Sequence, residues 1–123
     1  MVLVDSSSWI ESLRKSGRQD VRDRVQSLLA AGEAAWCNIV RLELWNGARG
    51  LHEKQALRDF EAHVPNLPID DVVWGLSIKL AERARSAGLT LSADDLIISA
   101  CARRHRVTVE HCDDHFRRLE EIH

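Results

Sequence analysis

No long hydrophobic run, no paired cysteine motif and no excess of positive charge occur in this chain of 123 residues. Its apolar stretches fall far short of the roughly 20 residues that span a bilayer. An acidic residue follows the apolar positions 2–4, so no secretory signal fits the N-terminus. We therefore expect no membrane segment and a cytoplasmic location.

Cysteine is scarce, and its spacing matches neither a disulfide framework nor a zinc site. Cys37, Cys101 and Cys112 form no CxxC pair, and each lies in or beside an apolar segment. We expect buried free thiols. His111 and His115 stand four residues apart, as two residues on one helix face would. Because the other Cys and His spacings of a zinc site are missing, we expect a surface or partly buried pair.

The net charge of −2 argues against a protein that binds nucleic acid through bulk positive charge. Any such contact must be local. Arginine far outnumbers lysine, and basic residues gather at positions 14–24 and 103–106. Guanidinium groups match phosphate well, but a solvated helix face explains each cluster equally well. Neither a P-loop nor a GxGxxG turn is present, so nucleotide binding has no motif support.

Hydrophobic residues make up 45% of the chain and charged residues 29%, which is typical of a globular protein of one domain, here residues 1–123. Short apolar runs predict four strands, and helical patterns separate them without a linker or repeat. The predicted strands are residues 2–4, 34–37, 67–69 and 107–109. Pro68 confines the third to a sheet edge or a strand start. Strands separated by helices imply a parallel sheet with helices on both faces.

Four carboxylates stand at the edges of these apolar runs: Asp5, Glu43, Asp95 or its neighbour Asp94, and Asp113. Element ends are where a parallel sheet gathers distant residues into one crevice. Unpaired acids about 4 Å apart would repel by roughly 4 kcal/mol per pair, against a domain stability of about 5–15 kcal/mol. Such a pocket must hold protons or a cation, and oxygen ligands suit Mg²⁺ or Mn²⁺.

Each acid also has a structural explanation. Asp5 could cap the helix that follows it, and Glu43 could point to water from an amphipathic helix. Ser92 and Asp95 satisfy a capping box, and both Asp94 and Asp95 suit a helix N-terminus. The residues alone therefore leave the choice between these two acids open.

Two further patterns concern the first helix and the tryptophans. Ser8 and Glu11 predict a capping box in which Ser8 is the N-cap of the first helix. We expect all four tryptophans to pack in the core, and Trp9, close after Asp5, is the best candidate for the rim of an acidic pocket. The others are Trp36, Trp45 and Trp74.

Four segments in order resemble the motifs of the PIN-domain ribonucleases, and among them the VapC-type toxins of bacterial toxin–antitoxin pairs. Residues 3–7 are similar to the strand followed by Asp-x-Ser, and residues 40–47 to the helical Glu before a small residue. Gly88 with residues 95–102 resembles the glycine, loop and Asp before an Ala-rich helix. Residues 111–116 resemble the final His-x-Asp-x-x-Phe. Each motif is weak alone, but together they are fairly specific.

The resemblance implies a PIN-like three-layer α/β/α sandwich whose central parallel sheet has four strands, or five if a final strand follows. Glu110 stands in the fourth strand where an apolar residue is usual. The family pattern selects Asp95 over Asp94 because Asp95 directly precedes the apolar helix. Its spacing to Phe116 selects Asp113 rather than the next acid along. The implied catalytic and metal-binding residues are Asp5, Glu43, Asp95 and Asp113, with Ser7 and Asp94 in support.

The implied activity is that of an endoribonuclease toxin dependent on Mg²⁺ or Mn²⁺. One or two ions would orient a water for in-line attack on an RNA phosphodiester, which leaves a 5′-phosphate and a 3′-hydroxyl. Ser7 would hydrogen-bond a carboxylate or a bound water. The implied partners are an RNA substrate, a VapB-like antitoxin that covers the acidic pocket, often with an arginine, and a second copy in a homodimer. Which RNA is cut stays open.

Two alternative functions belong to other classes of protein. A PIN-like module that binds RNA or protein without cutting would be expected to lack one of the carboxylates, whereas all four are present. Another Mg²⁺-dependent α/β phosphohydrolase, such as a phosphatase of the haloacid dehalogenase type, typically has Asp-x-Asp after the first strand. Ser7 occupies the second of those positions here.

Overall fold

A short parallel sheet forms the centre of the computed structural model, which describes residues 1–122. Its strands are β1 (Val2–Val4), β2 (Ala34–Ala35) and β3 (Thr108–Glu110), in the order β2-β1-β3. In the central strand β1, Leu3 pairs with Ala35 on one side and with Val109 on the other. Leu3 is fully buried, as expected for a strand with helices on both faces.

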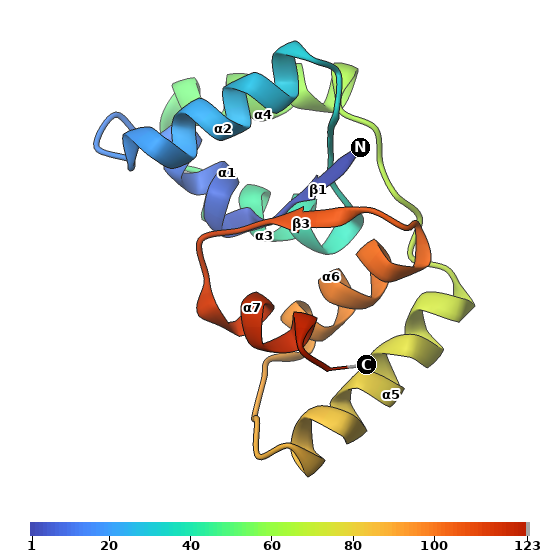
Figure 1. Cartoon of the computed structure of the whole chain (residues 1–123). Coiled ribbons are helices and arrows are strands. Elements are labelled where there is room, and N and C mark those ends of the chain that lie inside the picture. The colour runs from blue at the N-terminus through green and yellow to red at the C-terminus, as the bar shows by residue number, and fades with distance from the viewer. Residues whose placement is uncertain (123) are drawn as a thin grey trace.

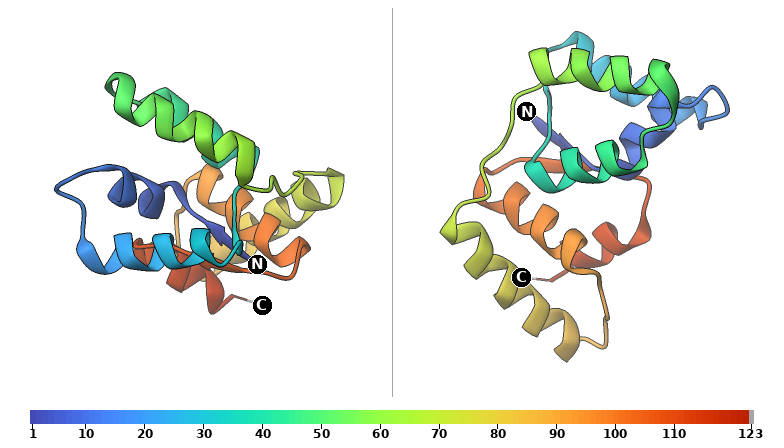
Figure 2. Two further views of the ribbon diagram at one scale, coloured as in Figure 1. Left: turned by 90° about the horizontal axis from the view of Figure 1, so that it is seen from above. Right: turned by 180° about the vertical axis from the view of Figure 1, so that it is seen from behind.

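Seven helices surround the sheet within the described residues. In Figure 1, α2 and α4 lie above the strands, α1 lies to their left, and α5, α6 and α7 lie below them. Seen from behind, α3 lies between α4 and α6 (Figure 2). None of these helices is both long and apolar enough to cross a membrane. Their bounds are α1 Ser6–Leu13, α2 Gln19–Ala30, α3 Asn38–Gly47, α4 Gly50–His63, α5 Asp71–Ser86, α6 Ala93–Arg104 and α7 Asp114–Glu120.

The sheet has three strands within residues 1–122, fewer than the four or five expected, although the α/β/α layering is as expected. The predicted strand at residues 67–69 does not form, and the adjacent Asn66 forms one parallel bridge with Trp36. In this bridge the amide of Leu67 donates to the carbonyl of Trp36 (2.8 Å). The pairing extends no further because α3 begins at Asn38, two residues after Trp36.

Helix α1 begins earlier than the capping-box pattern predicted. Asp5 is its N-cap, and the carboxylate accepts a hydrogen bond from the amide of Ser7 (3.0 Å). Ser8 lies inside the helix and is buried, while Glu11 accepts a hydrogen bond from the amide of Arg18 (2.8 Å). The capping-box prediction is therefore wrong, because the acid at the end of β1 already supplies a strong cap.

The tryptophans divide between core and surface. Trp9 and Trp36 are buried and pack with Phe60, and the ring centroid of Trp9 lies 4.7 Å from that of Phe60 and 5.8 Å from that of Trp36. Because Trp9 is 0% exposed, it does not stand at a pocket rim. Trp45 is partly buried, whereas Trp74 on α5 is 48% exposed, so the expectation of core packing for all four was wrong.

The three cysteines are free, as expected. Cys37 and Cys101 are buried in the core, and Cys112 is partly exposed in the connection between β3 and α7. They therefore contribute as small apolar side chains to packing.

The division of the tryptophans predicts very different costs of truncation. Trp9→Ala should lower the free energy of unfolding by about 3–5 kcal/mol because it empties a fully buried site. Trp74→Ala should cost less than about 1 kcal/mol because its ring is already half exposed. Urea unfolding followed by circular dichroism measures both values. Equal losses would contradict the placement of the two rings.

Candidate metal centre

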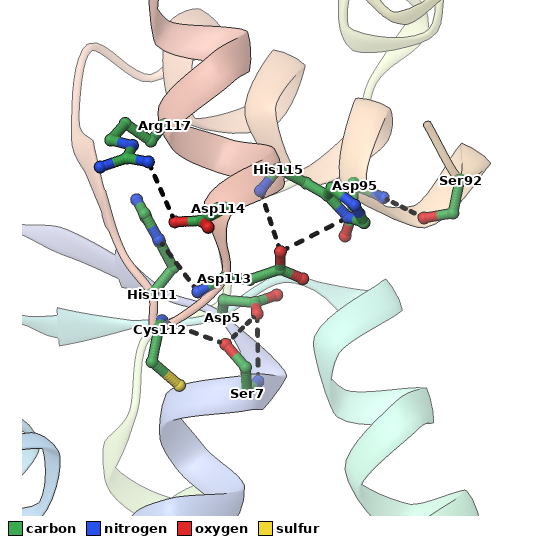
Figure 3. A network of polar contacts seen from close by, with 10 residues as sticks. All are labelled: Asp5, Ser7, Ser92, Asp95, His111, Cys112, Asp113, Asp114, His115 and Arg117. Carbon is green, nitrogen blue, oxygen red and sulfur yellow. Dashed lines mark hydrogen bonds and ion pairs between the residues drawn. The ribbon is translucent and has the colours of Figure 1, made fainter. Parts of the chain in front are cut away.

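The carboxyl ends of the strands and the N-termini of three helices meet at one edge of the sheet. Asp5 directly follows β1 and caps α1, and Asp113 follows β3 and caps α7. Asp95 lies in the first turn of α6. The amide of Asp5 donates to the carbonyl of Glu110 at the end of β3 (2.9 Å), which ties these segments together. Residues far apart in the sequence thus become neighbours, as a parallel sheet requires (Figure 3).

The tightest group in this region consists of Asp95, Asp113 and His115. The imidazole Nδ1 of His115 lies 3.3 Å from Oδ2 of Asp95 and 3.4 Å from Oδ1 of Asp113. One atom of each side chain that could bind a metal lies within 4.8 Å of the others. Figure 3 shows the contact of the imidazole with Asp113. The amide of His115 also donates to Oδ1 of Asp113 (2.9 Å), so the first turn of α7 holds this carboxylate in place.

Asp5 borders this group and is 4% exposed. The amide and the hydroxyl of Ser7 both donate to Oδ2 of Asp5, at 3.0 and 2.6 Å. Burial raises the pKa of Asp5 above its ordinary value, the hydrogen bonds from Ser7 act in the opposite direction, and the negative charge of Asp95 adds to the rise. The Ser7 hydroxyl also accepts from the amide of Cys112 (3.4 Å), which links Asp5 to the connection that carries Asp113.

Glu43 approaches from α3. Its Oε1 is buried, and no group within residues 1–122 hydrogen-bonds to it. Burial raises the pKa of Glu43 to about 7, and the charges of Asp94 and then Asp5 add to the rise. Asp94 therefore stands near Glu43, while Asp95 contacts His115, so both neighbouring acids border the same region. A buried carboxylate oxygen without a donor is costly unless a proton or a cation satisfies it.

The proximity of His115 to Asp95 and Asp113 was not predicted from the sequence. His111 is partly buried and His115 is exposed, as expected, but the two do not share a helix face because His111 precedes α7 and His115 lies in its first turn. Nε2 of His111 lies 3.6 Å from the carboxylate of Glu120, and its ring stacks near Phe116 at 5.2 Å. One feature of the sequence could have indicated this contact. His115 stands two residues after the N-cap acid Asp113, so both side chains lie at the N-terminal end of α7.

Several arginines of the two basic clusters serve the fold. Arg24 of α2 pairs with the carboxylate of Glu110, which explains an acidic residue at the end of β3. Arg103 of α6 donates to the carbonyl of Leu119 (2.6 Å) and fastens α7. These contacts favour structural roles for both arginines over roles in phosphate binding.

Comparison with protein families agrees with this geometry. The model of the PIN domain matches residues 2–122. This chain belongs to the PIN domain family. The match spans both the sheet and the edge at which the acids gather, so the fold and the site lie within one family domain.

Relatives of this PIN domain include VapC proteins of mycobacteria. "VapC ribonuclease Mb1587" of Mycobacterium bovis and "Ribonuclease VapC11" of Mycobacterium tuberculosis are each 31% identical to it over 120 residues, which cover 94% of this chain and 89% of each relative. Among solved structures, VapBC2 from Rickettsia felis, bound to a DNA fragment from its promoter, superposes with a TM-score of 0.77. That match covers 96% of this chain and 92% of the other at 18% identity, so it supports the fold alone.

The acids of this PIN domain fit a divalent cation. Within the described residues, no arginine or lysine forms an ion pair with Asp5, Glu43, Asp95 or Asp113. Burial raises the pKa of Asp5 and Glu43, and neighbouring acids add to the rise, as expected where protein cations do not compensate the negative charge. Carboxylate oxygens are ligands that Mg²⁺ and Mn²⁺ prefer. The donor set and the unsatisfied Oε1 of Glu43 therefore suit a cation.

The raised pKa of Glu43 predicts a pH-dependent effect of Glu43→Gln on stability. The stability that protonated Glu43 contributes is complete below its ordinary pKa of 4.5 and is lost as the pH rises through about 7. Without divalent cations, the free energy of unfolding of the variant should therefore exceed that of the wild type by roughly 1–2 kcal/mol at about pH 8, allowing for solvent screening. Near pH 5 the difference should be much smaller. Thermal unfolding with a chelator at both pH values measures the difference.

Glu82→Gln is the matched control, because Glu82 is exposed on α5. It should change the melting temperature little at either pH. An equal gain for Glu43→Gln at both pH values would show that the charge of Glu43 does not oppose folding.

Proposed function

We propose that this chain is a metal-dependent endoribonuclease and the toxin of a VapBC-type toxin–antitoxin pair. The observation that carries the proposal is the gathering of Asp5, Glu43, Asp95 and Asp113 at the carboxyl edge of the sheet without a lysine or arginine partner in the described residues. Membership of the PIN family and the names of the curated relatives support the same activity.

In this proposal each acid has a different role in cation binding. Asp95 and Asp113 hold a Mg²⁺ or Mn²⁺ ion from α6 and α7, since their oxygens already lie within 4.8 Å. Ser7 keeps the Asp5 carboxylate oriented through Oδ2, and Glu43 completes the pocket with an oxygen that no described residue satisfies. Asp94 supports the negative field around Glu43. When bound, the cation supplies positive charge against a phosphate and lowers the pKa of water.

The chemistry we propose is hydrolysis of an RNA phosphodiester by water in line with the leaving oxygen. The carboxylates would hold the cation, and the cation would supply positive charge to a phosphate oriented for attack, so that positioning and electrostatics would give much of the rate enhancement. The ribose 2′-hydroxyl takes no part in this route. The expected products therefore carry a 5′-phosphate and a 3′-hydroxyl.

We also propose that a VapB-like antitoxin covers the pocket between α1, α3 and α4. Apolar side chains line this pocket, including Ile10, Leu13, Leu44 and Leu57, and Glu43 lies at its wall. An apolar side chain of the partner would enter it while a cationic side chain pairs with Glu43, which would remove the charge that the site needs. The homodimer implied by the resemblance stays a prediction.

Asp5→Asn tests the metal centre. Asparagine caps a helix about as well as aspartate does, so the fold should persist while the charge is lost. We expect Mn²⁺ affinity at least about tenfold weaker by calorimetric titration, and no RNA cleavage. Circular dichroism checks that the fold is retained. Asp59→Asn, at an exposed site on α4, is the control and should bind Mn²⁺ as the wild type does. Full activity of Asp5→Asn would defeat the assignment.

A cleavage assay tests the activity itself. The protein should cut labelled RNA with Mg²⁺ or Mn²⁺, lose this activity in EDTA, and leave 5′-phosphate ends. p-Nitrophenyl phosphate serves as the phosphatase control. Its hydrolysis without RNA cleavage would favour another phosphohydrolase, and RNA binding without cleavage would favour a module that does not cut. Mapping of 5′ ends in cells after induction would identify the RNA.

A further inference from the structure

The acidic cluster contains an imidazole that faces two carboxylates at once. Nδ1 of His115 lies 3.3 Å from Oδ2 of Asp95 and 3.4 Å from Oδ1 of Asp113. The two acids come from different helices, since Asp95 lies in α6 and Asp113 caps α7. A simple surface ion pair would need only one of these acids.

The separations match those between neighbouring ligands of one ion. Bonds of about 2.0–2.1 Å from a dication to nitrogen and oxygen place adjacent ligands about 3.3 Å apart in a tetrahedral site and about 3.0 Å apart in an octahedral one. The two distances from Nδ1 lie close to both values, and all three atoms that could bind a metal lie within 4.8 Å of one another. Small side-chain rotations would therefore seat a cation among them.

We propose that His115 is a nitrogen ligand of the bound cation together with Asp95 and Asp113. This inference rests on the metal centre of the proposed function and goes beyond it, because it changes which cation the centre prefers. Carboxylates suit both Mg²⁺ and Mn²⁺, whereas an added imidazole nitrogen favours the transition-metal ion of the two. The centre therefore binds Mn²⁺ in preference to Mg²⁺.

The competing explanation is a shared proton. If Nδ1 carries a hydrogen, it donates to the two carboxylates and His115 only orients them. In that case the nitrogen is never bonded to the ion. The two explanations differ in one measurable property, which is whether a histidine nitrogen couples magnetically to bound Mn²⁺.

Pulsed electron paramagnetic resonance of the wild type loaded with Mn²⁺ makes that measurement. We expect a ¹⁴N coupling that changes to the ¹⁵N pattern when the protein is made with ¹⁵N-labelled histidine. His115→Gln should lose the coupling and bind Mn²⁺ at least about tenfold more weakly in a calorimetric titration, with a smaller change for Mg²⁺. His52→Gln, at an exposed site on α4, is the matched control and should keep both coupling and affinity.

The outcomes separate this inference from the proposed function. Bound Mn²⁺ without histidine coupling in the wild type, or unchanged coupling in His115→Gln, overturns His115 as a ligand and leaves the carboxylate centre standing. A wild type that binds no Mn²⁺ overturns the centre and this inference together. Circular dichroism reports the fold of the variant. The labelled wild type detects a histidine ligand even if that variant fails to fold.

Discussion

Repulsion among carboxylates at the carboxyl edge of the sheet is the interaction that the site must accommodate. Pairs of such charges about 4 Å apart repel by about 4 kcal/mol in a medium of effective dielectric near 20. The helix N-termini at Asp5, Asp95 and Asp113 each stabilise the carboxylate by only about 0.3–1 kcal/mol. The hydrogen bonds from Ser7, and the proton that Glu43 holds up to about pH 7, relieve more of the repulsion. A cation would relieve what is left, so the arrangement favours binding over a purely structural role.

Capping a helix and facing the site turn out to be compatible roles for the same acid. The carboxylate of Asp5 caps α1 through Oδ2, and that of Asp113 caps α7 through Oδ1, yet both border the group around His115. The structural and functional explanations that the sequence offered for Asp5 were therefore not alternatives. The cap fixes the orientation of the carboxylate, and a fixed carboxylate loses less entropy when it binds a ligand.

The sequence predicted the layering and most helices because apolar periodicity reports directly on which face is buried. The strand at residues 107–109 is confirmed within one residue. Properties decided by distant segments were harder to predict. Asn66 forms only a bridge because α3 starts soon after Trp36. Trp74 is exposed although a large apolar side chain is expected in the core. His115 was missed because its two acidic neighbours become close only when α6 and α7 pack together.

The candidate site consists of two groups of residues that interact electrostatically. Asp95, Asp113 and His115 form one group, and Asp5 with Glu43 forms the other. The negative charge of Asp95 raises the pKa of both Asp5 and Glu43. Neutralising Asp95 would therefore let Glu43 ionise more readily near neutral pH, because interacting carboxyl groups titrate as a coupled set. A positive charge among Asp95, Asp113 and His115 would therefore lower the pKa of Glu43 and leave Glu43 more negative near neutral pH.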